Sequence, residues 1–190
     1  SIRVLRASNR PSRRQGFRGA RPSMLAPLDL RGSTGFAALD DALGGGLHAG
    51  EVATLAAHPG QGLSTLAIQV ALNVERLGTC VAWIGSHIRP QAVRLRMESA
   101  LSRVSSILLA SGSDLSEAEE KRLRRTRAAL DRAPLLVACG GRSAADLELL
   151  LYAVAARGAA VAVVDGIDLP AGHARRVYVR LRAVAAATRL

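Results

Sequence analysis

A glycine-bearing segment at residues 57–65 has the residue types and spacing of a phosphate-binding loop. Glycines let successive backbone N–H groups turn towards an anion, and the start of a following helix adds a favourable dipole. The usual pattern is G-x-x-x-x-G-K-[ST]. Here Ala57 holds the first position, Gly62 the sixth and Ser64 the eighth. The candidate nucleotide-binding residues are therefore Pro59, Gly60, Gln61, Gly62, Leu63, Ser64 and Thr65.

Leu63 stands where that pattern has lysine, and the difference is chemical. A lysine ammonium reaches the β- and γ-phosphates of a nucleotide and offsets their charge, whereas leucine has neither a charge nor a donor. A charge-assisted hydrogen bond contributes about 1.5–3 kcal/mol. The segment therefore predicts weak nucleotide binding with poor hydrolysis, or else a glycine loop that only connects a strand to a helix.

Asp165 follows an apolar run at residues 160–164. The carboxyl ends of parallel strands face the ligand crevice of α/β proteins. In phosphate-loop enzymes a carboxylate there holds Mg²⁺ beside the loop hydroxyl. Ser64 and Asp165 are thus a candidate metal pair, and we expect them within about one water of each other. The alternative is an aspartate that only caps the next turn.

These candidate residues lie between elements that alternate along the chain. Short apolar runs bounded by glycine or proline predict strands near residues 52–57, 80–84, 135–138 and 160–165. Apolar residues at helical spacing, with capping patterns at Ser116 and Ser143, predict helices between the strands and one after the last. Strands that are apolar throughout are typical of a parallel sheet covered on both faces. The sequence therefore predicts an α/β fold.

Several stretches together resemble the ATPase domain of DnaB-type replicative helicases, within the RecA-like P-loop group; the RadA and KaiC branches are the next most similar. The similarity lies in the lead-in at residues 33–36, 45–47 and 50–51, the loop at 57–64, and the approach to the Asp-bearing strand at 133–135 and 143–157. The resemblance implies a three-layer sandwich with a mostly parallel sheet, incomplete at the C-terminus. It also implies ATP and Mg²⁺ as cofactors, and DNA or a helicase-like homo- or hetero-oligomer as partners.

Further departures from that family bear on catalysis. His87 aligns with the family's glutamate, which activates the attacking water; we interpret it as a loop histidine near the crevice rather than a base. The chain ends at Leu190, inside the helix after the Asp-bearing strand. The family's next strand, polar sensor and arginine finger are expected beyond that point. Of the family's catalytic set only Ser64 and Asp165 remain, and we name no catalytic residue.

Charge is unevenly distributed along the 190 residues, whose formal net charge is +11. Residues 1–28 contain seven arginines and no acidic residue. We expect residues 1–31 to form a disordered basic arm and residues 32–190 to form the RecA-like domain. The arm is either a solvated tail or a source of phosphate contacts. Candidate DNA contacts, or a solvated helix face, are Arg175, Arg176, Arg180 and Arg182.

Cysteine use and hydropathy bear on the compartment. Cys80 and Cys139 lie in apolar runs without metal-ligand spacing, which favours a reduced cytoplasmic setting over a disulfide framework. No run of about 18 uncharged apolar residues occurs, so we expect no membrane span. The basic N-terminus lacks the apolar core of a secretory signal.

Three hypotheses follow. The first is a DnaB-like helicase-related module with impaired catalysis, which binds nucleotide weakly and binds DNA or a partner helicase. The second is an active ATP-dependent DNA helicase or translocase of replication or recombination. The third is a nucleotide-sensing scaffold that does not bind DNA. Leu63 and His87 argue against the second hypothesis, and the arginine-rich arm favours the first over the third.

Overall fold

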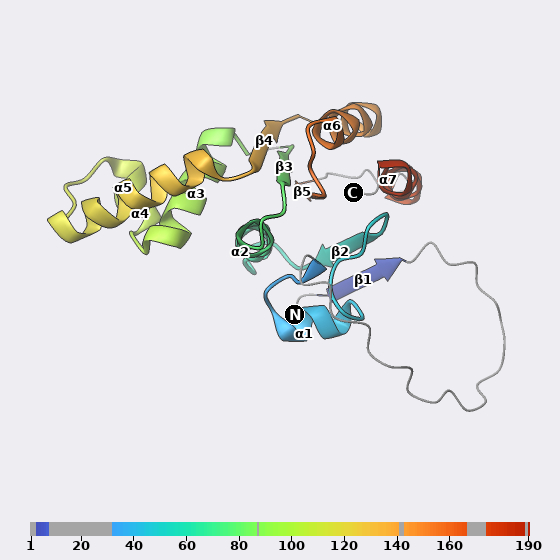
Figure 1. The fold of residues 1–190 in the computed structure, drawn as a ribbon, viewed down its shortest axis with the longest axis horizontal. Helices are drawn as coiled ribbons and strands as arrows, with labels where there is room; N and C mark the ends of the chain where they lie inside the picture. The colour runs from blue at the N-terminus through green and yellow to red at the C-terminus, as the bar shows by residue number, and fades with distance from the viewer. Residues whose placement is uncertain (1–2, 8–31, 87, 141–142, 167–173, 189) are drawn as a thin grey trace.

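A parallel three-stranded sheet forms the centre of the chain (Figure 1). The computed structural model describes residues 3–7, 32–86, 88–140, 143–166, 174–188 and 190. Within them β3 (Val81–Gly85) lies between β4 (Leu135–Cys139) and β5 (Val161–Asp165), and both neighbours run parallel to it. The three strands lie close to their expected positions, and the predicted α/β fold is confirmed.

Helices cover both faces of this sheet, because alternate β3 side chains point to opposite sides. Val81 and Trp83 pack with α2 (Leu63–Arg76) and α3 (Pro90–Ser102). Ala82 and Ile84 pack with α6 (Ala144–Ala156) and α7 (Ala174–Thr188). All four of these β3 side chains are fully buried. The result is the three-layer arrangement that an all-apolar parallel strand requires.

The strand that precedes the candidate loop differs from expectation. β2 (Val52–Ala56) is not hydrogen-bonded to the parallel sheet; it pairs antiparallel with β1 (Arg3–Ala7), with Val4 opposite Leu55. Residues 3–7, which the sequence assigns to the basic arm, form a strand in the structure. Backbone groups alone form such a ladder, which explains why an arginine-rich segment can pair without an apolar pattern. The boundary at residue 32 stays a prediction.

The segment before β2 is fixed by polar contacts. It contains α1 (Ala37–Ala42), whose N-cap is Phe36. The carboxylate of Asp40 accepts hydrogen bonds from the Ser33 hydroxyl at 2.7 Å, the Thr34 amide at 2.8 Å and the Thr34 hydroxyl at 2.6 Å. The Asn73 amide of α2 donates to the Thr34 carbonyl at 3.1 Å. Gly35 has φ +79° and Asn73 occupies the space of a side chain there, so only glycine fits.

Three helices form an extension that projects from one side of the sheet (Figure 1). They are α3, α4 (Ser106–Ser111) and α5 (Glu117–Arg132), and α3 packs along α5. The capping boxes predicted at Ser116 and Ser143 are both present. The sequence missed α4, because six residues are too few for a clear helical pattern. Among the helices that the structure describes, none has the length and apolar character needed to cross a bilayer.

Candidate functional site: a nucleotide and metal site

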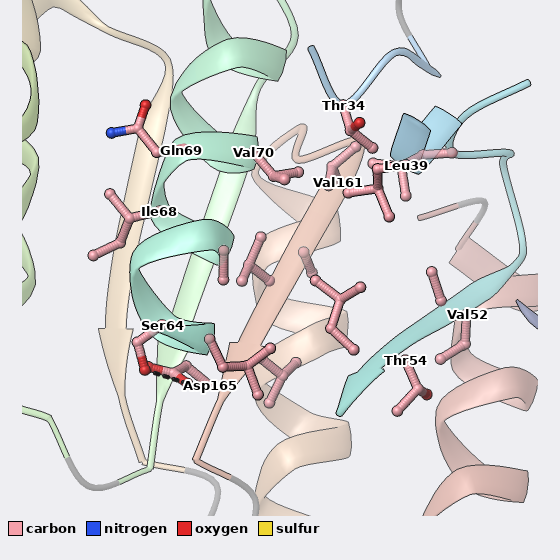
Figure 2. Close-up of a pocket in the computed structure, with 18 of the residues that line it drawn as sticks. Thr34, Leu39, Val52, Thr54, Ser64, Ile68, Gln69, Val70, Val161 and Asp165 are labelled. Atoms are coloured by element: carbon pink, nitrogen blue, oxygen red, sulfur yellow. Dashed lines mark hydrogen bonds between the residues drawn. The ribbon is translucent and has the colours of Figure 1, made fainter. Parts of the chain in front are cut away.

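Ser64 and Asp165 meet at the carboxyl end of β5 (Figure 2). Ser64 lies in the first turn of α2, and Asp165 is the last residue of β5. The Ser64 hydroxyl donates a hydrogen bond of 3.2 Å to Oδ1 of Asp165, although 101 residues separate the two. Both residues are half-buried. The structure therefore brings together the two side chains that the sequence proposed as metal ligands.

The second oxygen of Asp165 is the chemically distinctive atom of this site. Oδ2 is buried and has no hydrogen-bond partner among the described residues. Buried polar atoms are nearly always satisfied, and one without a protein partner points to an ion or water. Mg²⁺ prefers oxygen ligands such as carboxylates and hydroxyls, and it keeps several waters. The pair of Ser64 and Asp165 fits that ion.

The loop above Ser64 has the backbone form of an anion cradle. Gly60 and Gly62 both have φ +79°, and nothing lies within 4 Å of where a side chain on either would begin. Gly62 is the N-cap of α2, and no side chain caps that helix end. The first N–H groups of a helix have no partner within the helix and carry its positive dipole end. The exposed loop can thus offer backbone amides to phosphate.

Leu63 leaves that cradle without a cation. The residue is half-buried at the first position of α2. Its side chain has no donor, so any stabilisation of phosphate there comes from backbone dipoles. The remaining predicted binding residues, Pro59, Gly60, Gln61 and Thr65, are exposed around it.

The other predicted site residues are less well placed. His87 lies outside the described residues, as do the side chains of Arg175 and Arg176, whose backbones belong to α7. A guanidinium nitrogen of Arg180 lies 3.6 Å from a carboxylate oxygen of Glu148, so an acidic neighbour partly offsets its charge. Arg182 is half-buried. Their role in DNA binding stays a prediction.

A large cavity adjoins the site, and sequence reasoning missed it. Its volume is about 2110 Å³, above the range of roughly 300–1,000 Å³ usual for small-molecule sites. Gly60, Gly62, Ser64 and Asp165 lie on its wall, which continues along β2 and β5. No sequence pattern marks it, because the apolar run of β5 predicts burial on both faces, whereas its residues are only half-buried in the structure.

The sheet, the loop and the carboxylate together define a RecA-like P-loop domain. The model of the DnaB-like helicase C terminal domain family matches residues 32–189. The chain belongs to that family.

Known relatives agree with this assignment. The chain is 39% identical over 82 residues to the DNA repair protein RadA of Mycolicibacterium smegmatis, a match that covers 43% of this chain and 18% of RadA. One solved structure, of an ATPase domain, has a TM-score of 0.60 at 13% identity, covering 70% of this chain and 52% of that one. A DnaB-like replicative helicase, solved in a study of its interactions with primase, has a TM-score of 0.60 at 12% identity, covering 70% and 35%. The chain thus spans about a fifth to a half of the proteins that it matches.

Proposed function

We propose that this chain is a helicase-related module that binds Mg²⁺–nucleotide weakly and hydrolyses it poorly. The observation that carries the proposal is the Ser64–Asp165 contact beside a loop whose lysine position is Leu63. The ligand groups for a metal are present, while the cation that would hold the β- and γ-phosphates is absent from the loop. We therefore expect some nucleotide binding to persist while hydrolysis stays poor.

The chain's own residues supply two kinds of contact in this proposal. Backbone amides of residues 60–65 hold phosphate oxygens at the start of α2. Ser64 and Asp165 would hold Mg²⁺, which would offset phosphate charge when bound. Oδ1 of Asp165 also accepts a hydrogen bond from the Ser64 hydroxyl when no metal competes for it. Weak affinity follows because no ammonium adds to these contacts.

The action of the module is proposed to lie in contacts with DNA or with an oligomer of related helicases. Family membership supports this, as does the concentration of arginines in residues 1–28. Phosphate contacts by arginine give sequence-independent, salt-sensitive affinity. The family equally supports an active helicase, which remains the second candidate.

Nucleotide titration of the full chain tests this proposal. Leu63→Lys is expected to tighten Mg²⁺–ATP binding about 10- to 100-fold, since a charge-assisted hydrogen bond contributes about 1.5–3 kcal/mol. Leu77→Lys is the matched control, because Leu77 is exposed just after the last residue of α2, at the end of the helix opposite the loop. It is expected to leave the affinity unchanged.

Hydrolysis is measured on the same proteins with and without single-stranded DNA. We expect turnover near background for the unmodified chain. Leu63→Lys combined with His87→Glu is expected to restore nucleotide affinity more than turnover. The lysine contributes to binding by itself, whereas turnover requires all the catalytic groups that act as a unit. Robust DNA-stimulated hydrolysis by the unmodified chain, lost in Asp165→Ala, would establish the active helicase instead.

A further inference from the structure

Two buried side-chain atoms have no hydrogen-bond partner among the described residues, and one is a donor while the other is an acceptor. The acceptor is Oδ2 of Asp165, and the donor is the indole Nε1 of Trp83. Trp83 lies on the central strand β3, which is paired on both edges, and its side chain is fully buried. Because a buried indole N–H normally has a partner, this donor requires an explanation.

The strand register places both atoms on the face of the sheet that α2 covers. Trp83 packs in the core cluster that includes α2, and Asp165 contacts Ser64 of α2. A side chain at Gly85, on the same face of β3 as Trp83, would begin 3.6 Å from Nε1. Gly85 pairs with Asp165 in the parallel ladder, and neighbouring strands lie about 4.8 Å apart. The indole N–H therefore lies at the end of β3 that adjoins Asp165.

The two oxygens of Asp165 have different surroundings. Oδ1 accepts the hydrogen bond of 3.2 Å from the Ser64 hydroxyl (Figure 2). Oδ2 is buried and therefore enclosed by protein rather than open to the loop. A hydrogen bond to Oδ2 fixes the rotation of the carboxylate and keeps Oδ1 beside Ser64. Carboxylates that bind metals are generally held by neighbouring groups in this way.

One buried water can satisfy both atoms. A single water bridges polar atoms up to about 5.5 Å apart, because each hydrogen bond is about 2.8 Å long. Buried waters typically make about three hydrogen bonds, and the Ile88 carbonyl offers the third. It lies 3.1 Å from where a Gly85 side chain would begin, and it accepts from the Cys139 thiol at 2.8 Å with one lone pair left over. The water accepts from the indole and donates to the carboxylate and the carbonyl, so donors and acceptors balance.

We propose that Trp83 is a positioning residue of the metal site. Its indole N–H donates to a buried water, and that water donates to Oδ2 of Asp165. The link keeps Oδ1 turned towards the Ser64 hydroxyl, as the pair requires in order to hold one Mg²⁺. The inference rests on the proposed function, in which Asp165 is a metal ligand, and it adds a residue that no phosphate-loop pattern marks.

The indole N–H signal in a proton–nitrogen NMR spectrum tests the link in the full chain without any metal. Trp83 is the only tryptophan in the sequence, so a single indole signal reports on it. Asp165→Asn replaces the carboxylate with a neutral amide and is expected to shift this signal. Asp41→Asn removes an exposed carboxylate of α1 and is the control, expected to leave the signal in place. Transfer of magnetisation from water to the indole proton is also expected, although the side chain is fully buried.

Removing the N–H while keeping the ring tests the effect on the metal site. Growth on the benzothiophene analogue of tryptophan exchanges the N–H for sulfur at Trp83 alone. Binding of Mn²⁺ alone is expected to weaken about tenfold, the lower end of the loss usual for groups that hold metal ligands. Val81→Ala is the control, because Val81 is fully buried on the same face at the other end of β3. It is expected to lower stability and leave the Mn²⁺ affinity unchanged.

The two measurements separate this proposal from the proposed function. An indole signal that does not move in Asp165→Asn overturns the link, whether or not the unmodified chain binds Mn²⁺. Equal Mn²⁺ affinity with and without the indole N–H also overturns it, since Trp83 then only fills the core. If the indole signal shifts but the chain binds no Mn²⁺, the link to Asp165 stands and the proposed metal site is contradicted. If the chain with the analogue does not fold, the indole signal decides alone.

Discussion

At the scale of single residues, Asp40 is the side chain whose ionisation bears most directly on stability. Burial acts to raise its pKa, but hydrogen bonds from the Thr34 and Ser33 side chains and the Thr34 amide outweigh it and lower the pKa below the usual value. A carboxylate whose pKa is lower in the folded state stabilises the fold above its unfolded pKa. That contribution is lost as pH falls through the folded value.

Asp40→Asn is therefore expected to destabilise the chain by about 1–3 kcal/mol at pH 7, because it removes charge-assisted hydrogen bonds. The deficit should stay constant down to about pH 5 and shrink below about pH 4, the ordinary pKa of an unfolded aspartate, until Asp40 is protonated in the folded state as well. Urea unfolding at several pH values measures it. Asp41→Asn, at the exposed neighbouring position, is the control with little expected effect. An Asp40→Asn deficit that does not change with pH would contradict this account.

Single residues were predictable from sequence where local chemistry defines them. The capping boxes at Ser116 and Ser143 depend on residues three apart, and both form. Ser64 and Asp165 were placed by their positions after strands, and the structure brings them together. That Oδ2 of Asp165 has no hydrogen-bond partner in the described part of the chain was not predictable, because this depends on what surrounds β5 in three dimensions.

At the scale of elements, Glu98 holds the helical extension together. Its side chain is 9% exposed, and it bonds Arg94 at 3.1 Å within α3 and Arg127 of α5 at 3.0 Å. Arg94 also reaches Asp131 of α5 at 2.7 Å. Within α5 the exposed Arg124–Glu120 pair joins residues four apart, a spacing that can be recognised in a sequence. The contact between α3 and α5 was missed, because its partners lie 29 residues apart.

Glu98→Ala is accordingly expected to cost about 1–3 kcal/mol, since it removes charge-assisted hydrogen bonds that join a largely buried carboxylate to two arginines. Glu120→Ala is the matched control. Its pair with Arg124 is exposed on both sides, and exposed pairs contribute under about 1 kcal/mol. The free energy of unfolding, from denaturant titration of each variant, checks the difference. Equal losses in the two variants would mean that Glu98 does not join the helices.

Elements were predictable in type and order, and their pairing was less so. Apolar runs placed β3, β4 and β5, because an all-apolar strand has few stable surroundings other than a covered sheet. The same reasoning applied to β2, yet it pairs with β1. Periodicity identifies a strand but not the strand that pairs with it, so the division into two sheets required the structure.

At the scale of the whole molecule, the positions of the charged residues bear on DNA binding more than the net charge does. The net charge is +11, and seven of the arginines fall within the first 28 residues. Helix α5 of the extension is also basic, but Glu120 of the same helix and Glu98 of α3 pair with two of its arginines. Phosphate contacts need cations that are not already offset by carboxylates. We therefore expect any DNA affinity to depend on the first residues more than on the extension.

Two triple variants test this at equal change in net charge. The first variant replaces Arg10, Arg13 and Arg14, which lie outside β1, with glutamine. The second variant makes the same replacement at three exposed positions of α5, namely Lys121, Arg125 and Arg132. The salt dependence of single-stranded DNA binding, measured by fluorescence anisotropy, is expected to fall by up to about 2 in slope for the first variant, at roughly 0.7 per phosphate contact. The α5 variant is expected to keep its slope. Equal falls in both slopes would mean that DNA affinity follows total charge, because counterion release would not depend on where the cations lie. If neither slope falls, the first residues make no phosphate contacts.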